Sequence, residues 1–312
     1  MARTKARRGK APRTAQDRGR FAMSDPKCLI DARAVVGEGP LWHPVERLLY
    51  WIDIKNPHLY RFDPRTGEAR AWPMPERIGC YAFRRDGTLL VALKSGFHVF
   101  EPATGELRRI CDPEADLPGN RFNDGRADRR GRFFAGTMDD EEKAFTGSLY
   151  RLDPDYRVTR LEEGLGIANG IGWSPDDRTM YFTDSMRRVI WAYDYDIERG
   201  LPTGRRVFLE LPADDGFPDG LCVDAEGHVW TAVWGGWRVD RYAPDGRLVR
   251  RVAMPVPQPS SCCLGGPGLR TLFVTSARIG IDPATLEKAP LAGGLFALEV
   301  DVPGQPEALF AG

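Results

Sequence analysis

The stretch "FPDGLCVDAEGHVW", residues 217–230, places an acid–glycine pair directly before a short apolar run and then turns again almost at once. Runs that follow a turn signal and are rich in aromatic and β-branched residues are typical of short β-strands. The same pattern recurs along the chain after turn signals such as "RRDG", "DRRG" and "SPDDR". Its six copies align on anchors that are 40, 44, 47, 49 and 43 residues apart, namely Tyr50, Leu90, Phe134, Tyr181, Trp230 and Phe273.

A second strand-and-turn motif follows most of the copies, as in "HLYRFDPRTGE" and "GFHVFEPATGE". Six copies of about 45 residues without a convincing helix predict an all-β fold, a six-bladed β-propeller with four-stranded antiparallel blades. A β-sandwich is the alternative, but its strands would not repeat at this period. An open ring would leave exposed sheet edges. We therefore expect a strand within residues 27–36 to pair with the strand at residues 294–300 and close the ring.

Composition and charge divide the chain at residue 24. Residues 1–24 hold eight Lys or Arg and one Asp. We expect a disordered basic arm there, with a nucleic-acid tail or a transit peptide as alternatives, and one catalytic propeller domain over residues 25–312. The chain has no run of about 18 apolar residues that would span a membrane. Six Cys without a CxxC pair indicate a reducing, cytoplasmic location. We expect no nucleic-acid or membrane partner, and a monomer or weak homo-oligomer.

The residues that precede the anchors by eleven or twelve positions are the candidates for chemistry. In copies one, four and five they are Glu38, Asn169 and Asp219, each followed by glycine. The first strand of each propeller blade lines the central channel, so these three side chains would converge on one axis. Two carboxylates and an amide oxygen suit a hard divalent cation such as Ca²⁺, Mg²⁺ or Mn²⁺. Each pair, taken alone, also suits an ordinary turn, and the shared register across the copies favours the metal site.

Longer stretches carry a resemblance to a known family. They are "GEGPLWHP", "RFNDGRADRRGRFFAGTM", "ANGIGWSPDDRTMYFTDS" and "FPDGLCVDAEGHVWTAVWGG". Over nearly all of residues 30–312 the chain resembles the gluconolactonase/regucalcin (senescence-marker-protein-like) family of metal-dependent sugar lactonases. The resemblance implies a six-bladed propeller with one catalytic divalent metal (Ca, Mg, Mn, Zn or Fe) held by Glu38, Asn169 and Asp219.

The resemblance also implies the substrate contacts and the reaction. Arg121 and Asn123, in "RFND", match a substrate-contacting pair, and Glu141, in "GTMDDEE", matches a loop acid over the site. The small-molecule substrate would be a sugar lactone, such as gluconolactone, xylonolactone or arabinolactone, which is hydrolysed to an aldonic acid. Asp219 would act as general base, or mainly orient the attacking water, besides holding the metal.

Two other functions remain as alternatives at this point. One is an organophosphate-hydrolysing propeller, and the other is a non-catalytic propeller that binds calcium or a protein partner. The intact Glu/Asn/Asp set beside Arg121 and Asn123 favours catalysis, because a binding propeller need not keep both groups of residues.

Overall fold

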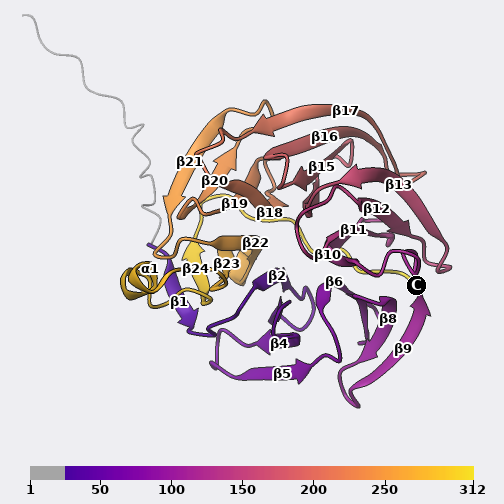
Figure 1. Cartoon of the computed structure of the whole chain (residues 1–312), viewed down its shortest axis with the longest axis horizontal. Coiled ribbons are helices and arrows are strands. Elements are labelled where there is room, and N and C mark those ends of the chain that lie inside the picture. The colour runs from indigo at the N-terminus through magenta and orange to yellow at the C-terminus, as the bar shows by residue number, and fades with distance from the viewer. Residues whose placement is uncertain (1–24) are drawn as a thin grey trace, which may run out of the picture.

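Six four-stranded antiparallel sheets surround a common axis in the computed structural model, which describes residues 25–312 (Figure 1). The predicted six-bladed propeller is confirmed, whereas the predicted arm over residues 1–24 lies outside the described residues. In the first five blades the strands follow chain order from the inside of the ring to its rim. These blades consist of β2 (Gly37–Trp42), β3 (Leu49–Asp53), β4 (His58–Phe62) and β5 (Ala69–Pro73); β6 (Ile78–Phe83), β7 (Leu89–Leu93), β8 (Gly96–Glu101) and β9 (Glu106–Cys111); β10 (Asn120–Ala127), β11 (Phe133–Asp139), β12 (Gly147–Leu152) and β13 (Val158–Leu165); β14 (Ala168–Trp173), β15 (Thr179–Asp184), β16 (Val189–Asp196) and β17 (Leu201–Glu210); and β18 (Phe217–Val223), β19 (Val229–Trp234), β20 (Arg238–Tyr242) and β21 (Leu248–Ala253).

The sixth blade closes the ring with strands that are far apart in the sequence. Its strands, from the inside outward, are β22 (Pro259–Gly265), β23 (Thr271–Ser276), β24 (Leu295–Glu299) and β1 (Lys27–Ile30). Lys27 lies opposite Ala297 in the antiparallel ladder between β1 and β24, so the predicted closure is confirmed. The closing strand is shorter than residues 27–36, because only the first four of those residues belong to β1.

One short α-helix departs from the expectation of no helix. The helix α1 (Pro283–Lys288) lies in the connection between β23 and β24. Asp282 caps its first turn by accepting a hydrogen bond from the Thr285 N–H at 3.0 Å, and Pro283 suits the first helical position. Six residues are too few to produce a helical period in the sequence. Across residues 25–312 no helix is long and apolar enough to cross a membrane.

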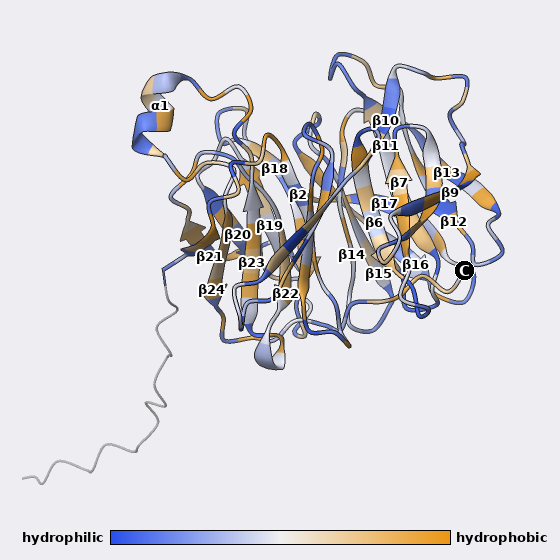
Figure 2. Ribbon diagram, turned by 90° about the horizontal axis from the view of Figure 1, so that it is seen from below, coloured by the Kyte–Doolittle hydropathy of each residue, from blue (hydrophilic) through white to orange (hydrophobic). Residues whose placement is uncertain are grey.

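The anchors of the sequence repeat form the core between neighbouring blades. All six lie on the second strand of a blade and are buried. Tyr50 of blade 1, for example, meets Phe83 of blade 2 edge to face, with ring centroids 5.1 Å apart. The side view shows hydrophobic residues concentrated in the strands and hydrophilic residues in many of the loops (Figure 2). The rim strand β17 is exposed or half-buried along its whole length, and its charged residues discourage pairing with other sheets.

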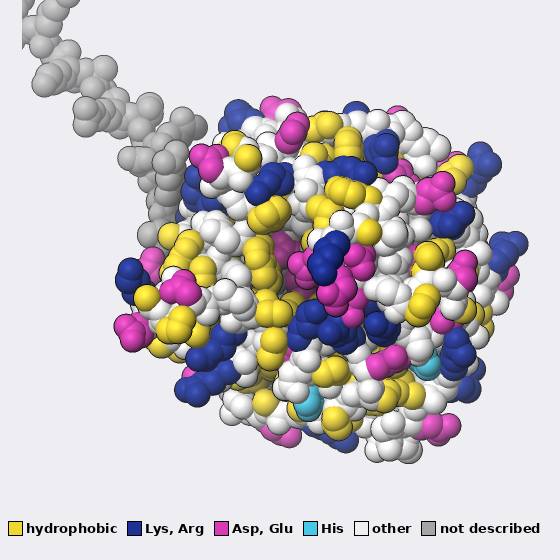
Figure 3. All heavy atoms as spheres, viewed as in Figure 1, with side chains coloured by type: hydrophobic (Ala, Val, Ile, Leu, Met, Phe, Trp, Pro, Cys, Tyr) yellow, Lys and Arg dark blue, Asp and Glu magenta, His cyan; other side chains and the backbone are white. Residues whose placement is uncertain are grey.

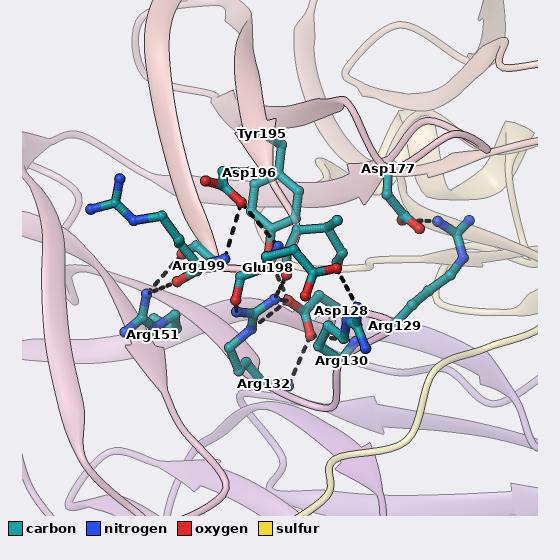
Figure 4. Close-up of polar contacts among 12 residues, drawn as sticks. Asp128, Arg129, Arg130, Arg132, Arg151, Asp177, Tyr195, Asp196, Glu198 and Arg199 are labelled. Carbon is teal, nitrogen blue, oxygen red and sulfur yellow. Dashed lines mark hydrogen bonds and ion pairs between the residues drawn. The ribbon is translucent and has the colours of Figure 1, made fainter.

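An aspartate fixes the turn that follows the inner strand of blade 3. Asp128 Oδ1 accepts hydrogen bonds from the backbone N–H groups of Arg130 (3.0 Å) and Arg132 (2.9 Å), as aspartates commonly do in turns. Its Oδ2 accepts from Arg132 Nε (2.7 Å) and from the hydroxyl of Tyr195 (2.5 Å). Because Tyr195 belongs to β16, the buried carboxylate ties blade 3 to blade 4 (Figure 4). The turn signal "DRRG" thus serves an inter-blade contact as well as a turn.

Residues 301–312, which we call the C-terminal strap, run from blade 6 across the ring towards blades 2 and 3 (Figure 1). The Phe310 N–H donates to the Phe83 carbonyl at 2.9 Å. Glu307 forms a salt bridge of 2.7 Å with Arg126 of the inner strand β10. The strap therefore joins blades that are not neighbours in the sequence.

Candidate active site

The inner strand of every blade breaks register with its second strand at the same place. Such β-bulges re-aim a side chain and are common beside active sites. The breaks coincide with the positions that the sequence alignment selected for chemistry. They lie between Glu38 and Leu41, Ile78 and Cys80, Phe122 and Gly125, Asn169 and Ile171, Pro218 and Leu221, and Pro259 and Ser261.

Glycines next to these positions let the inner strands approach one another. Gly39 has a φ of +53°, a conformation that favours glycine. A Cβ atom on Gly170 would lie 2.7 Å from the Asp219 carbonyl, and one on Gly220 would lie 2.1 Å from Ser261 Oγ. Neither contact leaves room for a side chain. Glycine at these positions therefore permits the close approach of neighbouring inner strands.

The three predicted metal ligands lie in one pocket of about 620 Å³. Glu38, Asn169 and Asp219 come from blades 1, 4 and 5 and are each 5–6% exposed. Arg121 and Asn123, from β10 of blade 3, line the same pocket. Asp and Glu side chains surround a hollow near the middle of the face shown in Figure 3. Other lining residues are Met138, Glu142, Ile167, Ser185, Phe217 and Trp234.

Two buried oxygens in the pocket have no partner among residues 25–312. They are Asn169 Oδ1 and Asp219 Oδ1. Asn169 Nδ2 donates to Ser185 Oγ at 2.9 Å, and Ser185 Oγ donates to the Pro218 carbonyl at 2.7 Å. Ser185 thus fixes the amide by its nitrogen and leaves the oxygen free, next to the strand that carries Asp219. Buried polar atoms are nearly always paired, so these two oxygens indicate a ligand that the protein itself does not supply.

Electrostatics lead to the same conclusion. Burial and the charge of Asp124 raise the pKa of Glu38 to about 8, although the Gly39 N–H and Arg121 act in the opposite direction. Burial and the charges of Glu38 and Asp124 raise the pKa of Asp219 well above its usual value. The protein therefore under-compensates these carboxylates, and a cation bound there would supply positive charge where they meet.

The donor set fits a hard divalent cation. Across the described part of the chain, no group of three or more His, Cys, Asp or Glu side chains could hold a metal ion. A metal in this pocket would therefore need the Asn169 amide oxygen together with the carboxylates of Glu38 and Asp219. Carboxylate and amide oxygens are ligands that Ca²⁺ prefers and that Mg²⁺ and Mn²⁺ accept.

Arg121 is held rigidly by its neighbours. Its Nε donates to Asp140 Oδ1 at 3.0 Å and its Nη1 to Asn123 Oδ1 at 2.6 Å. Asn123 in turn donates from Nδ2 to the Ala168 carbonyl at 2.8 Å. Asn123 therefore orients the guanidinium, and its second Nδ2 hydrogen and the second acceptor position of its Oδ1 remain for a sugar hydroxyl.

The loop acid that lines the pocket is Glu142, one residue after the expected Glu141. Glu141 was expected over the site, but its side chain is 75% exposed, pairs with Lys143 at 3.4 Å and does not line the pocket. Glu142 lines the pocket instead. The physical reason is a tight turn, in which the Glu142 N–H donates to the Asp139 carbonyl at 2.9 Å and Glu142 has a φ of +59°. This turn directs Glu141 to solvent.

An aromatic wall completes the pocket. Phe217 and Trp234 are opposite each other in the ladder between β18 and β19, and both line the pocket. The guanidinium of Arg188 lies 3.8 Å from the ring centroid of Phe217. Neither residue was predicted from the sequence, although Phe217 begins "FPDG" and Trp234 stands in "TAVWGG". Aromatic faces of this kind provide an apolar surface for the carbon face of a small polar ligand.

Comparison with known proteins places these features in context. The family model described as "SMP-30/Gluconolactonase/LRE-like region" matches residues 36–278. The chain is 42% identical to an L-arabinolactonase from Azospirillum brasilense, over 91% of this chain and 95% of that protein. It is 38% identical to a 6-deoxy-6-sulfogluconolactonase from Pseudomonas putida, over 92% and 98%. A crystal structure of a calcium-binding protein, regucalcin, from Agrobacterium tumefaciens matches with a TM-score of 0.88 and 34% identity, over 92% of this chain and 97% of that chain.

Proposed function

We propose that this chain, which belongs to the SMP-30/gluconolactonase/LRE-like family, is a divalent-metal-dependent hydrolase that opens sugar lactones to aldonic acids. The family that its motifs resemble is thereby confirmed. Relatives named as lactonases, at 38% and 42% identity over most of their length, support the reaction class. The identity of the lactone and the identity of the metal are part of this proposal.

One observation carries the metal dependence: the buried Asn169 Oδ1 and Asp219 Oδ1 have no partner among residues 25–312. With Glu38 they form an oxygen donor set from three blades. Three protein ligands leave coordination positions for water and substrate on a cation that takes six or more ligands. When bound there, a divalent cation polarises the ester carbonyl as a Lewis acid.

The protein side chains supply the other steps. Asp219 orients a water molecule and accepts its proton as the water oxygen bonds to the carbonyl carbon. The guanidinium of Arg121, fixed by Asn123 and Asp140, stabilises the negative charge that develops on the lactone. The bond between the carbonyl carbon and the ring oxygen then breaks, and the ring oxygen takes the proton held by Asp219 to become a hydroxyl of the aldonic acid. Phe217 and Trp234 hold the sugar beside these groups.

The substrate class follows from the pocket and the relatives. A pocket that combines the aromatic rings of Phe217 and Trp234 with a few converging polar groups suits a small polar molecule such as a five- or six-carbon lactone. The two relatives are named for a lactone of arabinose and for a sulfonated gluconolactone. The regucalcin structure, described as calcium-binding, makes Ca²⁺ the first metal to test. A cytoplasmic location, a monomeric or weakly homo-oligomeric state and the lack of nucleic-acid and membrane partners stay predictions.

The decisive experiment combines lactones with metals. The protein is stripped with a chelator, its residual metal is measured by elemental analysis, and it is refilled in turn with Ca²⁺, Mg²⁺, Mn²⁺, Zn²⁺ or Fe²⁺. Each form is assayed by acid release from a panel of aldonolactones and by hydrolysis of a phosphotriester. We expect lactone hydrolysis that disappears on stripping and returns on refilling. Full activity in metal-free protein would contradict the proposal. Phosphotriester hydrolysis alone, or metal binding without any turnover, would favour one of the two alternatives.

A further inference from the structure

A cluster of four cations lies beside the pocket and has a single acid at its centre. Asp140 Oδ1 is 3.0 Å from Arg121 Nε and 3.6 Å from Lys55 Nζ. Asp140 Oδ2 is 3.5 Å from Lys94 Nζ and also contacts Arg77 Nη1. These residues come from blades 1, 2 and 3. We call Lys55, Arg77 and Lys94 the basic rim.

The basic rim has hydrogen-bonding capacity that the protein does not use. Across residues 25–312, the side chains of Lys55, Arg77 and Lys94 have no ion-pair or hydrogen-bond partner other than Asp140. A lysine has three N–H donors and an arginine has five, whereas one carboxylate has about four acceptor positions, which Arg121 shares here. Several donors of the rim therefore remain available to a ligand.

Among residues 25–312, Asp140 is the only acid that pairs with the four cations of the cluster. Other acids lie nearby without pairing with them: Glu142, which lines the pocket, and Glu76, whose Oε1 accepts hydrogen bonds from the N–H (3.1 Å) and the hydroxyl of Ser95. Asp112 and Glu114 line the cavity that Lys94 also lines. Burial, together with the charges of Arg121 and Arg77, lowers the pKa of Lys55, even though Glu142 and Glu141 act in the opposite direction. The cations thus repel one another, and Asp140 does not fully compensate them.

The basic rim adjoins the place where the reaction would occur. Arg121 lines both the pocket with the metal-ligand set and a second cavity of about 620 Å³, which Lys94 also lines. Figure 3 shows Lys and Arg side chains gathered beside the Asp and Glu side chains near the middle of this face. A ligand can reach the side chains of the rim, which are 19% exposed for Lys55, 33% for Arg77 and 37% for Lys94.

We propose that the basic rim is a subsite for an anionic group on the substrate, so that the preferred lactone carries a carboxylate, sulfonate or phosphate away from its ester. This inference rests on the proposed lactonase function and adds the charge class of its substrate. The ester would lie at Glu38, Asn169 and Asp219, and the anionic group would lie beyond Arg121 at the rim. Charge-assisted hydrogen bonds to two or three cations suit all three anions.

A purely structural role predicts something different. If the cations only held the loop of residues 139–146 through Asp140, loss of one lysine would affect neutral and anionic lactones alike. If they bind the substrate, the loss would affect anionic lactones specifically, mainly through KM. The ratio of kcat/KM between an anionic and a neutral lactone therefore separates the two roles.

The test compares a neutral six-carbon aldonolactone with lactones that carry a terminal carboxylate, sulfonate or phosphate, using the metal-loaded full chain. We expect at least one anionic lactone to be preferred about tenfold or more. In Lys94→Gln the anionic-to-neutral ratio should fall about tenfold, through a raised KM for the anionic lactone. Lys55→Gln provides a second variant, and Lys288→Gln, on the exposed helix α1, is the matched control that should keep the wild-type ratio. Melting temperatures confirm folding of each variant.

Two results would overturn the subsite: no preference for any anionic lactone, or a preference that survives in both Lys94→Gln and Lys55→Gln. If no lactone is hydrolysed at all, the proposed function fails but the subsite can still be tested. Calorimetric titration then compares an aldonic acid with the aldonic acids that carry a second anionic group. The subsite is supported if a doubly charged acid binds more tightly than the singly charged acid and Lys94→Gln abolishes this difference. Equal binding of all acids overturns the subsite.

Discussion

At the scale of single residues, Asp219 is the side chain on which the site most depends. Its Oδ1 is buried and has no hydrogen-bond partner within residues 25–312, and burial together with the charge of Glu38 raises the pKa of its carboxyl group. Asp219→Asn keeps the shape but removes one negative charge and the capacity to accept a proton. Metal affinity should fall about tenfold or more, because the affinity of hard cations depends on ligand charge. Turnover at saturating metal should fall about 100-fold or more.

Calorimetric metal titration and the rate at saturating metal measure the two effects of Asp219→Asn separately. Asp245→Asn, in the exposed turn after β20, is the control and should match the wild type. An ordinary turn accepts Asn-Gly as readily as Asp-Gly. Near-normal metal binding together with a near-normal rate would therefore mean that Asp219 only shapes a turn.

The neighbouring acids Glu141 and Glu142 offer a matched pair of variants. Glu142 lines the pocket, whereas Glu141 is directed to solvent beside Lys143. Glu142→Gln should lower kcat/KM for a sugar lactone about tenfold, because a charged hydrogen-bond acceptor at the pocket is lost. Glu141→Gln should stay within about twofold of the wild type, since a surface ion pair contributes little. Steady-state kinetics on both variants decide the assignment, and the reverse order of effects would return the role to Glu141.

Predictability from the sequence differs between these residues for a physical reason. Glu38, Asn169 and Asp219 repeat at one position of successive blades, so an alignment of the chain with itself selects them. Glu142 lies in the connection between β11 and β12, which is longer than the corresponding connections of blades 1, 2, 4 and 5. Which of two adjacent acids faces the pocket depends on one φ angle of +59°, and the sequence carries no signal for it.

At the scale of strands and turns, the sequence predicts the strands well and their irregularities poorly. Aromatic and β-branched runs between turn signals mark the second strand of each blade, because those residues fill the core between blades. The bulges of the inner strands coincide with the glycine-bearing positions of the repeat, but that pattern alone does not distinguish a bulge from an ordinary turn, since a bulge depends on how two strands pair. Ser185 illustrates the same limit. It orients Asn169 only because the end of β15 lies beside β18, which no local pattern reveals.

The turn after β10 provides a stability test at this scale. Asp128 is buried and accepts hydrogen bonds from Arg132 and Tyr195 across two blades. Asp128→Ala should lower the free energy of unfolding by about 3–5 kcal/mol, because it leaves the guanidinium of Arg132 without its charge partner. Asp177 pairs with Arg129 and is more exposed than Asp128, with 21% of its side chain exposed against 0%. Asp177→Ala should lower the free energy of unfolding by no more than about 1 kcal/mol.

Denaturant unfolding of the Asp128→Ala and Asp177→Ala variants gives both values. The lactonase rate per folded molecule should be unchanged in both, because neither residue lines the pocket. Equal and small losses of stability would show that the buried carboxylate of Asp128 contributes no more than a surface one.

At the scale of the whole molecule, ring closure and ligand placement depend on each other. The proposed metal ligands come from blades 1, 4 and 5 and the guanidinium of Arg121 comes from blade 3, so the pocket exists only in the closed ring. The pairing of β1 with β24 closes the last blade. The C-terminal strap adds a second connection across the ring, which the blade repeat does not predict because the strap belongs to no blade.

The contribution of the C-terminal strap to stability can be tested through the ion pair between Glu307 and Arg126. Glu307 and Arg126 are 10% and 15% exposed at their side chains and lie 2.7 Å apart, and Glu307 raises the pKa of Arg126 although burial acts in the opposite direction. Glu307→Gln should lower the free energy of unfolding by about 3–5 kcal/mol, because a buried guanidinium loses its partner. The double variant Glu307→Gln with Arg126→Met should be less destabilised than Glu307→Gln alone, since it removes the uncompensated charge as well. Urea unfolding of the single and double variants measures this coupling. Simple addition of the two single losses would mean that the strap is held by its backbone contacts, such as the one from Phe310 to Phe83, and that the ion pair does not fasten it.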